Sequence, residues 1–291
     1  MRVPATVLTM LLVCLGAAMS AHTQDTSSAV GADRIHDSPE WQQISLHLPD
    51  PATAASAQLE TAADVLRARR YPGDAMRFYE AAISHGGDQM TLLKKMGVTC
   101  LEMQQVPLAR ILFQRAVRLN KKDAGAWNDL GAAEFILHNT GGSIRDYKRA
   151  VKLEKSSAVF HSNLSLAYFE VRNTDEARRE LGKALALDPN LLHRGANSGY
   201  TAQVLASERY PEICFEMARI YAAQGNVEAL LEWLTKASER GFDVRSAMDR
   251  DPSLQPLLAD ARVQLLLNNA QVLRASIKVR GSVPSLGTAE R

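Results

Sequence analysis

The sequence predicts an all-α protein built from helical hairpins that stack on one another. Apolar residues recur at helical spacing in paired blocks from Ser56 onward, small residues recur every 34 positions, and polar turn residues separate the blocks. The composition agrees with a folded helical chain, because 46% of the residues are hydrophobic, 23% are charged and only 6% are aromatic. No stretch alternates strictly between apolar and polar residues, as a half-buried strand would.

The N-terminal segment, from Met1 to Ser20, has the features of a signal peptide. Arg2 gives a positive start, an apolar run extends from Val7 to Met19, and Ala18 and Ser20 are the small residues that a cleavage site requires. The run is too short to cross a bilayer, and no later segment is long and apolar enough to do so. We expect export to the periplasm or out of the cell, with cleavage after Ser20. The alternative is a buried N-terminal helix.

Residues 21–55 are predicted to form a linker that contains one short helix. The stretch up to about residue 37 is polar and rich in small residues. Ser38 then has the place of a helix N-cap and Pro39 lies in the first turn. The prolines at positions 49 and 51 end this helix before the repeats begin.

The repeat keeps one period over four units and shows no insertion among them. Small residues occupy three equivalent positions of each unit: Ala63, Gly97, Gly131 and Ser165; Ala75, Ala109, Ser143 and Ala177; Ala82, Ala116, Ala150 and Ala184. A large residue precedes the last of these positions by three: Tyr79, Phe113, Tyr147 and Leu181. Small residues let two helices approach closely, and we expect the large residue to fill the space between units.

A turn divides each unit into two helices. The breaks fall at residues 71–74, 104–107, 139–142 and 172–175, where Gly, Pro, Asn, Asp or Gln cluster. One hairpin cannot bury its apolar face alone, so neighbouring hairpins must stack. We place the units at residues 56–89, 90–123, 124–157 and 158–191.

These units resemble tetratricopeptide repeats (TPR), whose pattern has an early Trp, then Leu-Gly and Tyr, and later Ala, an aromatic residue, Ala and Pro. The third unit carries Trp127, Leu130, Gly131, Ser143, Tyr147 and Ala150, and the fourth carries Leu164, Tyr168, Ala177, Ala184 and Pro189. Glu134 departs from the pattern, because it stands where Tyr is expected. The resemblance implies a right-handed superhelical solenoid whose first helices line a concave surface, the usual ligand site of the family.

The register is lost after residue 191. Residues 192–210 are predicted to be an insertion, and residues 211–279 a degenerate unit of the same kind followed by capping helices. A solenoid needs such a cap to cover its last apolar face. We expect residues 280–291 to be a disordered tail.

The chain carries no pattern that predicts catalysis. Its histidines have no Cys or acidic partner at metal-ligand spacing, and there is no nucleophile elbow, phosphate loop or HExxH motif. We therefore predict no enzyme, no metal and no cofactor. His161 is expected to be a packing residue rather than a ligand or base. Cys100 and Cys214 are expected to be buried free thiols.

The formal net charge is only +2, which argues against a nucleic-acid binder. Basic residues nevertheless recur on the second helices: Arg115, Arg118, Arg145, Arg149, Lys152, Arg179 and Lys183. They form either a basic outer ridge that meets an anionic surface or an ordinary solvated face.

The resemblance places ten candidate binding residues on the first helices. They are Lys94, Val98, Leu101, Asn128, Ala132, Phe135, Ile136, Ser162, Leu166 and Phe169. This surface is largely apolar and differs from the lysine and arginine clamp of chaperone-binding relatives. It suits an amphipathic helix or an extended apolar segment. The alternative is that the insertion, or the segment around Trp41, folds back to cover it.

These observations predict a non-enzymatic scaffold or adaptor of the bacterial cell envelope. It would bind a protein or peptide segment in the concave groove, with Lys94 and Asn128 orienting the ligand. The alternative is a structural component of an envelope assembly, which acts through self-association or through its basic convex surface.

Overall fold

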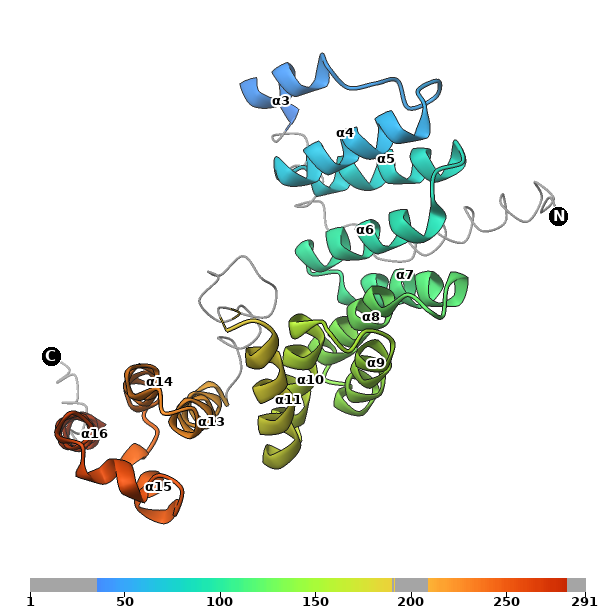
Figure 1. Ribbon diagram of the computed structural model, residues 1–291. Coiled ribbons are helices and arrows are strands. Elements are labelled where there is room, and N and C mark those ends of the chain that lie inside the picture. The colour runs from blue at the N-terminus through green and yellow to red at the C-terminus, as the bar shows by residue number, and fades with distance from the viewer. Residues whose placement is uncertain (1–35, 190, 192–208, 282–291) are drawn as a thin grey trace, which may run out of the picture.

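The computed structural model describes residues 36–189, 191 and 209–281, which form thirteen α-helices and one 3-10 helix (Figure 1). No strand occurs in this part of the chain. The predicted all-α repeat fold is confirmed. The predicted signal peptide, residues 21–35 of the linker and nearly all of the insertion lie outside the described residues.

Helix α3 (Pro39–Ser45) begins as the sequence predicts. The Ser38 hydroxyl accepts a hydrogen bond from the backbone N–H of Trp41 at 3.1 Å, and Pro39 occupies the first turn. The Trp41 ring stacks on His36, with ring centroids 4.1 Å apart, and lies 4.9 Å from the ring of Tyr71. These contacts join α3 to the first hairpin.

Four hairpins follow, and the second begins at Gln89, one residue before the expected unit 90–123. They are α4 (Ser56–Ala68) with α5 (Pro72–Ser84), α6 (Gln89–Glu102) with α7 (Val106–Leu119), α8 (Ala124–Ile136) with α9 (Thr140–Leu153), and α10 (Ala158–Glu170) with α11 (Thr174–Leu187). The two helices of a hairpin pack along each other, and the second helix contacts the first helix of the next hairpin. Each hairpin therefore buries its apolar face against its neighbours.

The turns inside the four hairpins share one backbone conformation. A non-glycine residue with φ between 58° and 67° follows each first helix: Arg70, Gln104, His138 and Arg172. The next residue then donates its backbone N–H to a carbonyl in the last turn of that helix, as Gln105 does to Cys100 at 2.8 Å. A left-handed residue followed by this bond is a usual helix C-terminus. The same turn therefore recurs once in every unit with unrelated side chains.

Small and large residues of the repeat meet within each of two hairpins. A Cβ atom on Gly97 would lie 2.3 Å from the Phe113 ring, and one on Gly131 would lie 2.7 Å from the Tyr147 ring. Both glycines are therefore required by a close approach of an aromatic ring from the second helix of the same hairpin. Tyr147 also belongs to the core cluster that contains Leu164 and Tyr168 of the next unit, so a ring that lies against the glycine of its own hairpin takes part in the packing between units as well.

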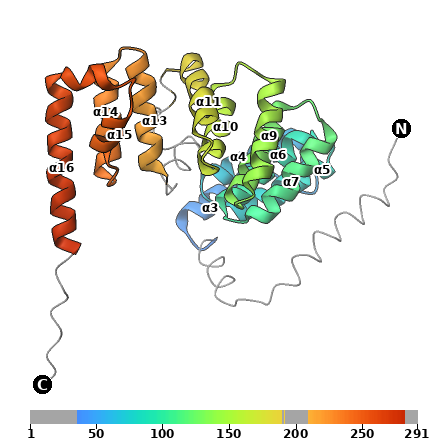
Figure 2. The same cartoon turned by 90° about the horizontal axis from the view of Figure 1, so that it is seen from below.

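A fifth hairpin and a cap end the described chain (Figure 2). Helices α13 (Tyr210–Ala223) and α14 (Val227–Glu239) form the hairpin, and α15 (Val244–Arg250), the 3-10 helix η1 (Gln255–Ala259) and α16 (Ala261–Gly281) follow. Helix α16 packs on α14 and buries Val263 and Leu267 completely. It continues through residues 280 and 281, where a disordered tail was expected. None of the described helices is long and apolar enough to cross a membrane.

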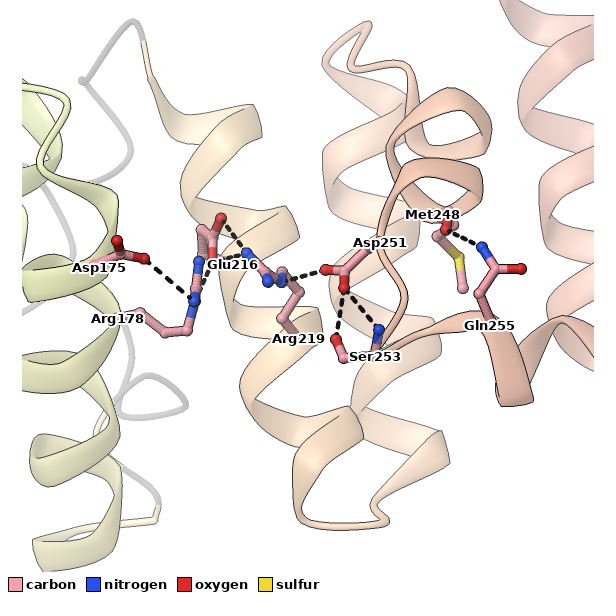
Figure 3. A network of polar contacts seen from close by, with 8 residues as sticks. All are labelled: Asp175, Arg178, Glu216, Arg219, Met248, Asp251, Ser253 and Gln255. Atoms are coloured by element: carbon pink, nitrogen blue, oxygen red, sulfur yellow. Dashed lines mark hydrogen bonds and ion pairs between the residues drawn. The ribbon is translucent and has the colours of Figure 1, made fainter.

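A chain of ion pairs connects the fourth hairpin to the fifth (Figure 3). Arg178 of α11 contacts the carboxylate of Glu216 on α13 at 2.7 Å. Glu216 also binds Arg219 at 3.1 Å, and Arg219 reaches Asp251 at 2.6 Å. Burial raises the pKa of Asp251, but hydrogen bonds from Ser253 and the arginine charge outweigh it and hold that pKa below its usual value. We call Arg178, Glu216, Arg219 and Asp251 the junction network.

The stack has an inner and an outer face. The first helices contact one another directly, α6 with α8 and α8 with α10, whereas each second helix is separated from the next by the first helix between them. The stack therefore curves towards its first helices. We call the side formed by α6, α8 and α10 the inner face, and the side formed by the second helices the outer face.

Candidate functional site

The ten candidate binding residues lie on the three helices of the inner face. Lys94, Val98 and Leu101 belong to α6, the residues from Asn128 to Ile136 to α8, and Ser162, Leu166 and Phe169 to α10. The solvent exposure of their side chains differs from one helix to the next, and this difference determines which helices a partner can contact.

Helices α6 and α8 present an accessible apolar surface. Five of their side chains stay partly exposed on these two contacting helices: Val98, Leu101, Ala132, Phe135 and Ile136. Ile136 is 36% exposed, and the other four lie partly buried against the core. We call these five residues the apolar strip.

The candidate residues of α10 are covered. Ser162, Leu166 and Phe169 are 0%, 1% and 4% exposed. Leu166 and Phe169 belong to a core cluster that also contains Ile213 and Met217 of α13. Helical spacing assigns a residue to a face of its helix, but it does not reveal which segment packs on that face. The accessible part of the predicted groove is thus confined to α6 and α8.

Lys94 and Asn128 already have partners within the protein. Lys94 donates a hydrogen bond at 3.1 Å to Asp123, the carboxylate that caps α8. The Asn128 side-chain carbonyl accepts a hydrogen bond from Asn163 of α10 at 2.8 Å. These two contacts fix α8 relative to α6 and α10, so both residues link neighbouring helices of the inner face.

Asp129 is a polar residue of the inner face that the sequence reasoning did not single out. Burial raises the pKa of its carboxyl group to about 6, although the charge of Lys94 acts in the opposite direction. Its hydrogen bond from the Asn128 side chain is long, at 3.5 Å. The carboxylate is therefore weakly satisfied. In the sequence, Asp129 stands out as an acid inside the most apolar stretch of the third unit. It was not among the ten candidate binding residues, because its position in the unit was not expected to face the concave surface.

A cleft of about 970 Å³ opens on the outer face between α9 and α11. Apolar residues of three helices line it, among them Val151, Tyr168 and Leu187. Four lysines lie around it: Lys148, Lys152, Lys155 and Lys183. We call this feature the outer cleft. It arises because α10 separates the second helices of the third and fourth hairpins.

His161 is buried at the floor of the outer cleft, as expected for a packing residue. Its Nε2 donates a hydrogen bond to the backbone carbonyl of Lys155 at 3.0 Å, and its Nδ1 lies 2.5 Å from the Glu180 carboxylate. Trp127 has the equivalent position one unit earlier and donates its indole N–H to the carbonyl of Lys121 at 3.0 Å. The two side chains thus make the same contact at equivalent positions of successive units.

The remaining chemistry of the described residues is limited. Cys100 and Cys214 are buried free thiols, as predicted, and burial raises the pKa of each to about 11. Thiols of this kind are poor nucleophiles at neutral pH. No group of three His, Cys, Asp or Glu side chains within residues 36–189, 191 and 209–281 is placed to hold a metal ion.

Stacked two-helix units that repeat with one regular period define a class of α-helical solenoid. The family model of the tetratricopeptide repeat matches residues 158–191, the fourth hairpin. The fourth hairpin therefore matches a tetratricopeptide repeat, and the three preceding hairpins repeat the same turn and the same small residues.

Solved structures of the same class are similar to this chain at low identity. MamA from Desulfovibrio magneticus RS-1 is 16% identical over 66% of this chain and 96% of its own, with a TM-score of 0.47. TTC0263, a thermophilic TPR protein of Thermus thermophilus, is 20% identical over 72% and 100%, with a TM-score of 0.45. YrrB, described as a TPR protein with an unusual peptide-binding site, is 18% identical over 64% and 86%, with a TM-score of 0.44. No curated protein has a matching sequence.

Proposed function

We propose that this chain is a non-enzymatic scaffold that binds an apolar segment of a partner protein on its inner face. The observation that carries the proposal is the apolar strip on α6 and α8, where five apolar side chains remain accessible on two helices that contact each other. Contiguous exposed apolar surface in a folded protein usually marks an interaction site. An amphipathic helix or an extended segment is the ligand that such a surface fits.

Contacts between the helices fix the inner face in the free protein. Lys94 and Asp123 hold α6 against α8, and the bond between Asn128 and Asn163 holds α8 against α10. A preformed surface reduces the ordering cost of association. Phe135 supplies the aromatic anchor, and the Asp129 carboxylate, whose hydrogen bond from Asn128 is long, offers an acceptor to an N–H group of the bound segment.

The test uses an exposed residue of the strip. The full chain and its Ile136→Asp variant are used to capture proteins from an envelope extract, together with an Ile111→Asp control. Ile111 is 44% exposed on α7, outside the strip, so the control makes the same chemical change on another helix. We expect Ile136→Asp to lose a partner that the original chain and the control retain. Equal capture by all three chains contradicts the proposal.

Phe135→Asp is the stronger version of this test and is read only at matched helicity, because Phe135 also packs against the core. Phe169→Asp is unsuitable, since Phe169 is 4% exposed and an acid there would damage the fold.

We further propose that the scaffold works in the bacterial cell envelope after export. The support is the N-terminal sequence, with its positive start, its apolar run and its small residues at positions 18 and 20. Expression of the full chain in a Gram-negative host, followed by fractionation and N-terminal sequencing, tests this proposal. We expect a periplasmic protein that begins at Ala21. A cytoplasmic protein that keeps its first residues contradicts export and leaves the scaffold proposal intact.

A structural role in envelope assembly remains the second candidate. It is favoured by the outer cleft, where lysines surround an apolar floor. If self-association carries this role, the sedimentation coefficient of the full chain rises with concentration in the micromolar range. A constant value for a monomer contradicts that route.

A further inference from the structure

The four lysines of the outer cleft differ in whether they form an ion pair. Lys183 binds the Glu180 carboxylate at 2.7 Å. In contrast, Lys148, Lys152 and Lys155 form no ion pair with any residue in the described parts of the chain. The ammonium group of Lys148 lies 5.5 Å from the centroid of the Tyr168 ring, which keeps it over the cleft. Three cations thus surround one recess without a compensating carboxylate.

The two carboxylates of the cleft are already engaged. Glu180 contacts both His161 and Lys183, and these groups outweigh its burial and hold its pKa below the usual value. Glu176 binds Arg179 on the same helix at 2.9 Å. Neither acid is therefore free to neutralise the three unpaired lysines, and the recess carries a net positive charge although the whole chain is nearly neutral.

The floor between these lysines is apolar. Leu187 is 45% exposed, and Val151 is partly accessible on the facing helix. Tyr168 and Leu164 of α10 close the bottom of the recess. The outer cleft thus combines a cationic rim with an apolar base, a pattern whose complement is a segment with acids on one side and apolar side chains on the other.

We propose that the outer cleft is a second binding site, which takes an acidic amphipathic segment of a partner protein and is separate from the inner face. The acids of this segment contact Lys148, Lys152 and Lys155, while its apolar side chains cover Val151 and Leu187. A flat anionic lipid surface would contact the lysines but would leave the cleft between α9 and α11 unfilled. A peptide segment satisfies both parts of the site.

A defined peptide tests the proposal. The probe is a fluorescein-labelled twelve-residue peptide with Glu and Leu at helical spacing, and its binding to the full chain is followed by fluorescence anisotropy. One control peptide has Gln in place of Glu, and another has Ser in place of Leu. The test variant is Lys148→Glu/Lys152→Glu. The matched variant is Arg118→Glu/Lys122→Glu, which makes the same charge change at two exposed positions outside the cleft.

We expect saturable binding of the Glu-Leu peptide that weakens as salt is added, because its charged contacts are screened. The cleft variant should lower the affinity roughly tenfold, and the matched variant less than about threefold. Both control peptides should bind more weakly than the probe. Ile136→Asp on the inner face should leave this binding unchanged, so the two sites are tested independently.

Three results overturn the proposal. If the two double variants weaken binding equally, the attraction is diffuse and the cleft is not a site. If the Ser-containing peptide binds as well as the probe, the apolar floor takes no part. If phosphatidylglycerol vesicles bind the full chain and the peptide does not, the lysines serve an anionic lipid surface.

Discussion

At the residue scale, Gly131 shows why the repeat demands a small side chain at one position. The Tyr147 ring occupies the space that a Cβ atom would need, at 2.7 Å from it, and the ring itself is only 1% exposed. Gly97 and Phe113 repeat the arrangement one unit earlier. The sequence showed that these positions are small, but not that their partner is an aromatic ring of the same hairpin.

Gly131→Ala should destabilise the protein by about 1–3 kcal/mol, because overpacking forces the Tyr147 ring to move. The measurement is urea unfolding followed by circular dichroism. Gly141→Ala is the control, since nothing lies within 4 Å of a Cβ atom at that position in the first turn of α9. Alanine has a higher helix propensity than glycine, by about 1 kcal/mol in a helix interior, so this effect favours both variants in the same direction. Equal stability of the two variants would show that the ring does not require the glycine.

Asp129 makes stability depend on pH in a defined direction. Burial raises its pKa to about 6 in the folded protein, above the usual value of about 4 for an aspartate. The folded state therefore holds the proton more tightly than the unfolded state. The stability that the protonated Asp129 carboxyl group adds to the folded state is fully present below about pH 4 and is lost as the pH rises through about 6. Asp129→Asn should accordingly raise the melting temperature at pH 7.5 and change it little at pH 4. An equal effect at both pH values contradicts the raised pKa.

At the scale of the element, the sequence was most informative where the repeat is regular. Small residues at a fixed period located four hairpins, and Ser38 with Pro39 located the start of α3. The burial of the α10 candidates did not follow from this pattern. Leu166 and Phe169 share a core cluster with residues of α13, which follows the point where the register is lost, and no repeated position predicts that grouping.

The junction network is the clearest element-scale feature that sequence reasoning missed. Arg178 and Glu216 are 38 positions apart, on either side of the stretch where the repeat is interrupted. No spacing rule connects them. Because Glu216 is 7% exposed and contacts Arg178 of α11, it links α13 to α11 by a nearly buried polar contact.

Glu216→Gln should loosen the fifth hairpin and cost about 1–3 kcal/mol, because hydrogen bonds to a charged group are lost in a nearly buried place. Hydrogen exchange of α13 and α14 measures the effect. Glu212→Gln is the control on the same helix, where a 54% exposed carboxylate should contribute about 0–1 kcal/mol. Similar exchange in the two variants would mean that the network does not hold the hairpin.

Acid should act on the same junction. The pKa of Asp251 is lower in the folded protein than in the unfolded chain. The stability that its carboxylate adds to the folded state is therefore present above the usual aspartate pKa of about 4 and is lost as the pH falls below that value.

At the scale of the whole molecule, the core has two parts. One cluster of buried side chains extends from α4 to α8, and the other includes residues from α9 to α16. They meet within the third hairpin, where Leu130 belongs to the first and Tyr147 to the second. In a solenoid each unit is stabilised only by its neighbours. The two parts should therefore respond separately to local damage.

Leu234→Ala and Leu92→Ala test this division. Both leucines are fully buried, Leu234 in the C-terminal cluster and Leu92 in the N-terminal one, and each change should cost about 2–5 kcal/mol. Hydrogen exchange detected by mass spectrometry should show lost protection in α13 and α14 for Leu234→Ala, and in α4 to α7 for Leu92→Ala. Loss across the whole chain in either variant would show one cooperative unit instead.

The small net charge of the chain does not reveal that unpaired positive charge gathers on the outer face. The formal value of +2 correctly disfavoured a large basic excess, yet the unpaired lysines gather on the outer face while the acids of the cleft are engaged. The sequence identified the recurring basic residues of the second helices. It could not identify which of them lack a partner, because ion pairs depend on the placement of side chains in space.

The three tryptophans happen to sample three different parts of the molecule, which makes the natural protein its own optical probe. Trp41 stacks on His36 beside the first hairpin, Trp127 lies near Lys148 and Lys152 on the outer face, and Trp233 is 5% exposed in the fifth hairpin. Three single-tryptophan chains, with phenylalanine at the other two positions, would thus give separate emission signals for these regions. Occupancy of the outer face and melting of either end could then be followed by fluorescence without an attached dye.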